Sequence, residues 1–178
     1  MIIIARLNED VNWAKEYNHF IVQKDVHLPN IGREPLSYIW YIIKYYDELE
    51  GIYIFCQGNP FHHYKDAHTV FEHPEPGFNW YSDMAEIQSD LDGRPYDNGL
   101  EIDVFLKNCG IECKQNGFFF NAGCFFSIEA EQIKRKPKKY YERVYKALLM
   151  TNKAPWAFER VVYIIFGVGK YENNKRSI

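Results

Sequence analysis

Apolar and polar positions alternate in blocks along the first third of the chain. Residues 2–5 form a short β-branched run that predicts a buried strand, and residues 19–24 predict a second one. Between residues 34 and 50 the apolar side chains recur at helical spacing, and Pro35 suits the first turn, where an N–H has no helical partner. A strand predicted over residues 52–56 follows after a short link. This order of elements predicts a parallel sheet with covering helices.

The remainder of the chain mixes irregular and regular segments. Residues 58–99 are rich in Pro, Gly, Asp and Asn and lack sustained periodicity, so we expect a long irregular stretch, which in a compact domain is more often functional than idle. Residues 117–120 and 124–128 predict two strands joined by a tight turn at residues 121–123. Helices are predicted over residues 100–107, from about residue 137 and from about residue 155.

Length and composition fit one packed domain. A chain of 178 residues can bury one core, and an apolar fraction of 47% excludes intrinsic disorder. We therefore expect a single α/β domain over residues 1–169, with a mostly parallel central sheet and helices on both faces. Residues 170–178 are expected to form a polar C-terminal tail.

Charge, cysteines and apolar runs narrow the range of partners. The net charge of −3 gives no general attraction to nucleic acid, and we interpret the basic run over residues 134–139 as a solvated face. No apolar segment is long enough to span a bilayer, and the apolar N-terminus is too short for a signal peptide, so we expect a cytoplasmic protein without a membrane span. Cys109 and Cys113 lack a second pair at zinc-site spacing, so the four cysteines are predicted to be reduced core residues.

Polar side chains follow two of the predicted strands. Arg6, Asn8 and Glu9 come after the first strand, and Gln57 and Asn59 come at the end of the strand that follows the long helix. Because the carboxyl ends of parallel strands meet at one edge of an open α/β sheet, these residues predict a ligand-binding edge.

A polar turn opens the long helix and ends in Arg33 and Glu34. The N–H groups of a helix N-terminus beside an arginine form a ready anion site. The alternative is that the two residues only start the helix, since acidic residues suit this position. The ligand-binding edge expected nearby favours the anion site.

Several motifs stand in order along almost the whole chain. They are residues 4–13, residues 29–34 with Tyr38, residues 55–60, residues 122–127 with Ile133, Lys136-Pro137 with Tyr141, and Glu159. Together they resemble an uncharacterised family, domain of unknown function thirty-four thirty-one. That family is in turn similar to compact nucleotide-diphospho-sugar transferases of the GT-A fold.

The resemblance implies a donor site and a metal. Residues that it places around a nucleotide-sugar donor are Arg6, Asn8, Glu9, Asn30, Gly32, Arg33, Glu34, Gln57, Asn59 and His62. In GT-A enzymes a strand ends in Asp-x-Asp, whose carboxylates hold Mn²⁺ or Mg²⁺ against the diphosphate. Here Gln57 and Asn59 replace those carboxylates, and neutral amides bind a hard cation less well, so tight metal binding at this position is doubtful. Bidentate hydrogen bonds from Arg6 and Arg33 are the alternative means of neutralising a diphosphate.

Glu159 lies near the start of the last predicted helix. It resembles the late acidic residue that acts as general base in many inverting GT-A enzymes, where it removes a proton from the acceptor hydroxyl. The alternative is that Glu159 is a first-turn glutamate favoured by the helix dipole. With the resemblance, the expected function is transfer of a sugar from a nucleotide-diphosphate donor to a glycan or another hydroxyl acceptor.

Two other groups of residues suggest metal chemistry. His62, His63, His68 and His73 lie close together, but their spacing matches no helical metal pair with a catalytic glutamate, so contact with a diphosphate is the better interpretation. The one Asp-x-Asp string, at Asp90 and Asp92, lies in a Gly- and Pro-containing loop and is interpreted as a turn, with both residues kept as weak candidate metal ligands.

Two alternatives to glycosyl transfer remain open. One is a non-catalytic nucleotide- or carbohydrate-binding domain that kept the fold and lost the metal carboxylates, as Gln57 and Asn59 suggest. The other is a metal-dependent hydrolase that uses the cluster from His62 to His73.

Overall fold

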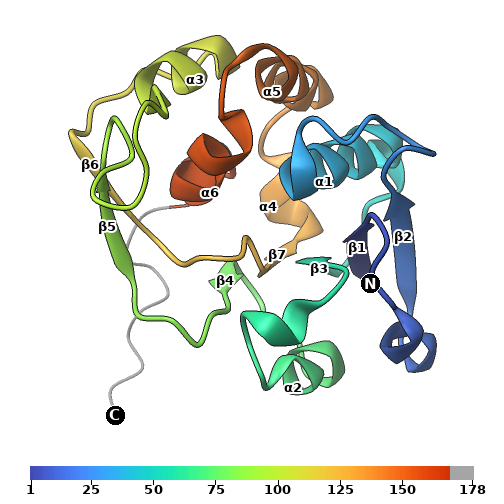
Figure 1. The fold of residues 1–178 in the computed structure, drawn as a ribbon. Coiled ribbons are helices and arrows are strands. Elements are labelled where there is room, and N and C mark those ends of the chain that lie inside the picture. The colour runs from blue at the N-terminus through green and yellow to red at the C-terminus, as the bar shows by residue number, and fades with distance from the viewer. Residues whose placement is uncertain (169–178) are drawn as a thin grey trace.

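A five-stranded mixed sheet lies at the centre of the fold (Figure 1). The computed structural model describes residues 1–168. The strands run in the order β2 (His19–Gln23), β1 (Ile2–Arg6), β3 (Ile52–Gln57), β7 (Phe126–Glu129) and β4 (Asn79–Trp80). β1 is parallel to β2 and β3, whereas β7 is antiparallel to β3 and β4. The α/β class is confirmed, but the prediction of a mostly parallel sheet is wrong, since half of these pairings are antiparallel.

Helices cover both faces of the sheet (Figure 1). The larger group packs on one face and consists of α1 (Arg33–Lys44), α3 (Ile102–Cys109), α4 (Ala130–Lys134), α5 (Lys138–Met150) and α6 (Ala154–Ile165). The other face carries α2 (Ala67–Glu72) and the 3₁₀ turn η1 (Asn12–Glu16). The helices predicted near residues 100, 137 and 155 correspond to α3, α5 and α6.

The two-sided cover explains why β1 is apolar throughout. Ile3 and Ala5 belong to the core beneath α1, whereas Ile2 and Ile4 belong to the core beneath α2. Successive side chains of a strand point to opposite faces, so a strand that is covered on both sides has no solvent-facing position.

The predicted hairpin over residues 117–128 is wrong. Its first strand, β6 (Gly117–Phe120), pairs with β5 (Ile87–Asp90) in a separate two-stranded sheet, and its second strand, β7, joins the central sheet. Gly123 and Cys124, in the turn between β6 and β7, both have positive φ, +101° and +47°. β7 pairs antiparallel to both of its neighbours, β3 and β4.

The segment from residue 58 to residue 99 is more regular than predicted. Besides α2, β4 and β5 it contains the 3₁₀ turn η3 (Pro60–His62). These elements have two to six residues each, too few for a sustained period to show in the sequence. The predicted helix over residues 34–50 also ends early, because α1 stops at Lys44 and a 3₁₀ turn, η2 (Tyr46–Glu48), follows.

Three remaining predictions concern cysteines, membrane and tail. Cys56, Cys109 and Cys124 are buried, as predicted for core residues, whereas Cys113 is only half-buried; all four thiols are free. No helix formed by residues 1–168 combines the length and the apolar character that crossing a bilayer requires. The predicted tail, residues 170–178, lies outside the described residues, as does residue 169.

Candidate functional site

A cavity of about 190 Å³ opens at the carboxyl end of β3. The chain places β2 on one side of β1 and β3 on the other, so the order of the parallel strands reverses between β1 and β3. Open α/β sheets bind ligands at such a reversal, outside the carboxyl ends of the strands. The cavity is lined by the N-terminus of α1, the end of β3, the residue after η3, the turn before β7 and the start of α6.

Four predicted site residues from three separate motifs line this cavity. Arg33 and Glu34 come from the first turn of α1, Gln57 is the last residue of β3, and Glu159 lies in α6. The structure therefore brings together residues that are more than one hundred positions apart in the sequence.

Glu34 is held by a lysine that is itself almost buried. Lys24 has a side-chain exposure of 4%, and its Nζ lies 2.8 Å from Oε1 of Glu34, to which it donates a hydrogen bond. Burial alone would raise the pKa of Glu34, but the charge and the hydrogen bond of Lys24 outweigh it and lower the pKa. Glu34 is therefore ionised at neutral pH and presents a fixed acceptor to the cavity.

Arg33 and Trp156 form one wall. The guanidinium carbon of Arg33 lies 5.0 Å from the centre of the Trp156 ring, within the range of a cation–π contact. Nε of Arg33 is also 3.6 Å from Oε2 of Glu34. Trp156 is 37% exposed, so part of its surface is open to a ligand.

Glu159 is fixed from two sides. Its Oε1 accepts a hydrogen bond of 2.7 Å from the backbone N–H of Gly123, and its Oε2 accepts one of 2.5 Å from Nη1 of Arg160. Burial raises the pKa of Glu159 even though Arg160 and the N–H of Gly123 act in the opposite direction. The carboxylate thus has a defined position and a raised proton affinity.

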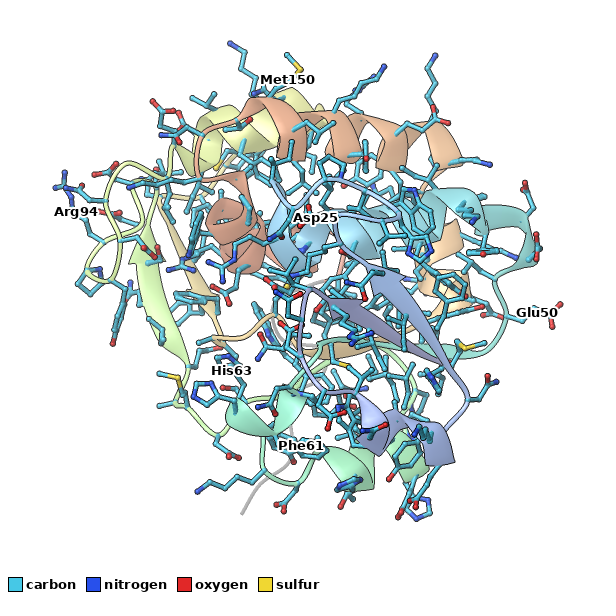
Figure 2. All side chains as sticks on the ribbon, turned by 45° about the vertical axis from the view of Figure 1, so that its right-hand side comes forward. Asp25, Glu50, Phe61, His63, Arg94 and Met150 are labelled. Atoms are coloured by element: carbon cyan, nitrogen blue, oxygen red, sulfur yellow. The ribbon has the colours of Figure 1, made fainter. Side chains whose placement is uncertain are left out.

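Gly123 lets His63 approach the turn before β7. A Cβ atom on Gly123 would lie 2.6 Å from Cγ of His63, and the φ of Gly123, +101°, is one that other residues rarely adopt. His63, labelled in Figure 2, follows directly after η3. Burial and the neighbouring His62 lower the pKa of His63, so its imidazole is neutral at pH 7.

The other predicted donor residues lie beside the cavity but do not line it. The loop after β1 is organised by Glu9, whose Oε2 accepts hydrogen bonds from the N–H groups of Leu7 and Asn8. Arg6 donates from Nε to the carbonyl of Glu9, and a Cβ on Gly58 would meet the Glu9 side chain, so this loop borders the end of β3.

The remaining members of the predicted donor set have backbone roles. Asn30 donates its N–H to Oδ1 of Asp25, and Gly32 is the residue before α1. Asn59 precedes η3, and its carbonyl accepts a hydrogen bond from Nε2 of Gln57. His62 contacts the ring of His63 edge to face but is not among the residues that line the cavity.

The candidate metal groups are separated or already bonded. Nδ1 of His68 is 2.6 Å from the hydroxyl of Tyr17, and His73 is the residue that follows α2. The four histidines do not form a metal-binding group. Asp90 accepts hydrogen bonds from the N–H groups of Asp92 and Arg94, which agrees with its interpretation as a turn residue. Within residues 1–168, no three His, Cys, Asp or Glu side chains gather in a way that could hold a metal ion.

The oxygen atoms near the cavity do not fit a resident divalent cation. Glu34 is paired with Lys24, and Glu159 is paired with Arg160. Gln57 and Asn59, at the positions where the resemblance expects Asp-x-Asp, carry neutral amides, which are weak ligands for such an ion. No catalytic step proposed for this cavity depends on a metal.

Several residues of the cavity, among them His63, Gly123 and Trp156, were not predicted from the sequence as site residues. His63 stood in the histidine cluster, but nothing in the spacing favoured it over His62. The sequence predicts Gly123 in a tight turn and in one motif of the resemblance, but gives it no role at the site. Trp156 could have been found from the sequence, because it precedes Glu159 by three positions and therefore lies on nearly the same face of the helix.

Comparison with known proteins gives no further guidance, since no family model, no curated protein and no solved structure matches the chain significantly. The resemblance to the family of unknown function and to GT-A enzymes stays a prediction.

The lowered pKa of Glu34 predicts a pH-dependent stability. A carboxyl group whose pKa is lower in the folded state stabilises the protein above its ordinary pKa, and this contribution is lost as the pH falls. The free energy of unfolding of the wild-type protein should therefore fall more steeply than that of a Glu34→Gln variant between about pH 6 and pH 3, measured by urea unfolding. Glu112→Gln is the control, because the Glu112 side chain is 81% exposed and lies 3.6 Å from Lys114. Equal pH slopes for wild type and Glu34→Gln would contradict this reading.

Proposed function

We propose that the cavity binds the sugar of a nucleotide-diphosphate donor and that the protein transfers this sugar to a hydroxyl acceptor, as a compact GT-A-like enzyme. The convergence of Arg33, Glu34, Gln57 and Glu159 on one cavity at the strand reversal carries the proposal. The four residues come from three separate motifs, since Arg33 and Glu34 are neighbours, and each motif was expected from the sequence at a donor or catalytic site.

The balance of charge favours a neutral, hydroxyl-rich group in the cavity. Three cations face three carboxylates in and directly behind its walls: Lys24, Arg33 and Arg160 against Glu34, Asp97 and Glu159. The carboxylates remain hydrogen-bond acceptors, and hydroxyl groups are donors that carry no charge. A sugar ring satisfies these acceptors without the repulsion that a phosphate group would meet at Glu34 and Glu159.

The size of the cavity supports the same assignment. A volume of about 190 Å³ is below the roughly 300–1,000 Å³ of sites for drug-sized ligands, so it suits one sugar ring better than a whole nucleotide sugar. The nucleotide would lie outside, along the loop that carries Arg6, Asn8 and Glu9. Arg33 lines the cavity with a side chain that is 53% exposed, and it would hold the diphosphate through hydrogen bonds from its guanidinium.

In this proposal Glu159 is the general base. Its raised pKa suits a group that accepts a proton near neutral pH. It would take the proton of the acceptor hydroxyl while that oxygen attacks the anomeric carbon and the nucleoside diphosphate leaves. Four free thiols fit a reducing compartment, so we place this activity in the cytoplasm.

One observation favours a second candidate function. Both oxygens of Glu159 already have partners, the N–H of Gly123 and the guanidinium of Arg160. A carboxylate held in this way can accept hydrogen bonds from sugar hydroxyls without taking part in catalysis. The alternative is therefore a non-catalytic nucleotide- or carbohydrate-binding domain.

A thermal-shift screen tests the donor site. The probes are nucleoside diphosphates and their sugar conjugates, among them UDP-glucose and GDP-mannose, each with and without manganese. A donor at 100 times its Kd should stabilise the folded protein by about 2.7 kcal/mol and raise its Tm, and an Arg33→Ala variant should lose the shift. Glu142→Gln, an exposed residue of α5, is the matched control. No shift with any probe would contradict the donor site.

A further inference from the structure

A buried arginine connects Glu159 to a second carboxylate outside the cavity. The side chain of Arg160 is 3% exposed, and its Nη1 donates to Oε2 of Glu159 at 2.5 Å. Its Nη2 forms an ion pair with Asp97, in the loop between β5 and α3. Asp97 is 30% exposed and does not line the cavity.

The guanidinium has little freedom to move. Its central carbon lies 3.8 Å from the centre of the Phe120 ring, and Nη1 also approaches the carbonyl of Trp156 at 3.5 Å. Glu159 and Arg160 are adjacent residues of α6, so their ion pair forms within one helix. Asp97 therefore binds the side of the guanidinium that Glu159 leaves open.

We propose that Arg160 and Asp97 are positioning residues for Glu159: Arg160 fixes the carboxylate at the cavity, and Asp97 offsets the charge of Arg160 so that Glu159 remains able to accept a proton. A guanidinium shared between two carboxylates stabilises each anion less than one dedicated to a single carboxylate. The catalytic role assigned here rests on the proposed function, whereas the ion-pair network of Glu159, Arg160 and Asp97 does not depend on it.

Among the charged and titratable groups around Glu159, Asp97 is the one whose replacement tests this proposal. Those that face Glu159 or share its cavity are Arg160 from α6, Asp97 from the loop before α3, the N–H of Gly123 and the thiol of Cys124 from the turn before β7, Arg33, Glu34 and Tyr38 from α1, and His63 after η3. Asp97 is the carboxylate among them that shares the guanidinium of Arg160, and its negative charge raises the pKa of Glu159.

The test measures the pKa of Glu159 in the full chain without ligand by carbon NMR of the glutamate side chains. The Glu159 signal is assigned by its loss in Glu159→Gln. Replacing Asp97 by asparagine should lower this pKa by about one unit, because Arg160 then serves Glu159 alone. Asp97→Glu should keep the pKa close to the wild-type value. If transfer is detectable, the acid limb of its pH profile should move to lower pH in Asp97→Asn.

A matched control separates electrostatics from loop structure. Asp92 lies in the same loop, where it pairs with Arg94 and accepts a hydrogen bond from the N–H of Gly99. Asp92→Asn should leave the pKa of Glu159 unchanged, and Asp97→Ser repeats the test if Asp97→Asn does not fold. An unchanged pKa of Glu159 in both Asp97→Asn and Asp97→Ser, or an equal change in Asp92→Asn, would overturn the proposal. A lowered pKa in a protein without transfer activity would leave the network intact and count against the proposed function alone.

Discussion

Replacing Glu159 by glutamine is expected to reduce sugar transfer by about 10²- to 10⁴-fold, the usual contribution of a general base. Glutamine has nearly the same shape and retains an oxygen that can accept the hydrogen bond from Gly123, but it cannot take a proton from the acceptor. Donor binding should therefore remain close to that of the wild type. The measurements are release of nucleoside diphosphate from the donor and, separately, the thermal shift with the same donor.

Two comparisons make this result interpretable. Glu142→Gln, on the exposed side of α5, should keep full activity. Full activity of Glu159→Gln would contradict the assignment of the base and would favour a different acceptor of the proton. Loss of donor binding together with activity would show that Glu159 binds sugar hydroxyls, as in the non-catalytic alternative.

Replacing Gly123 by alanine is expected to destabilise the protein by about 3 kcal/mol. Two costs add: a φ of +101° strains any residue with a Cβ, and the new methyl group would lie 2.6 Å from Cγ of His63. Both His63 and the N–H that holds Glu159 would be displaced, so the donor-induced thermal shift should shrink as well. Urea unfolding measures the change in the free energy of unfolding.

Gly51 provides the matched control for Gly123. It also has a positive φ, +67°, but a Cβ there would meet no atom within 4 Å. Gly51→Ala should therefore show only the backbone strain, about 1 kcal/mol. Equal effects of the two substitutions would mean that the approach of His63 to Gly123 contributes nothing to stability.

The sequence allowed part of this fold and site to be predicted because some signals are local. The helical period that begins at Pro35 predicted α1, and the apolar run of residues 2–5 predicted β1. Arg33 and Gln57 could be predicted as site residues for the same reason, since each stands at the end of an element whose position the pattern already indicated.

Other features depend on contacts between distant parts of the chain. β6 and β7 were each detectable, but short apolar runs carry no information about which sheet they join. The ion pair of Arg160 with Asp97 joins residues 63 positions apart, and Asp97 lies in a loop without a motif. His63 reaches the cavity because Gly123 has no side chain, a fit that only the folded arrangement displays.

The most direct test of the proposed sugar site is a nitrogen–proton NMR titration of the full chain with UDP-glucose and GDP-mannose. The indole N–H of Trp156, assigned by its loss in Trp156→Phe, and the backbone N–H of Gly123 report on two residues that line the cavity from different elements, α6 and the turn before β7. Our account predicts that one of these donors shifts both signals in a saturable manner, while its nucleoside diphosphate alone shifts mainly signals of the loop at residues 6–9. Saturable shifts confined to other parts of the molecule, or no shifts with any nucleotide sugar, would contradict it.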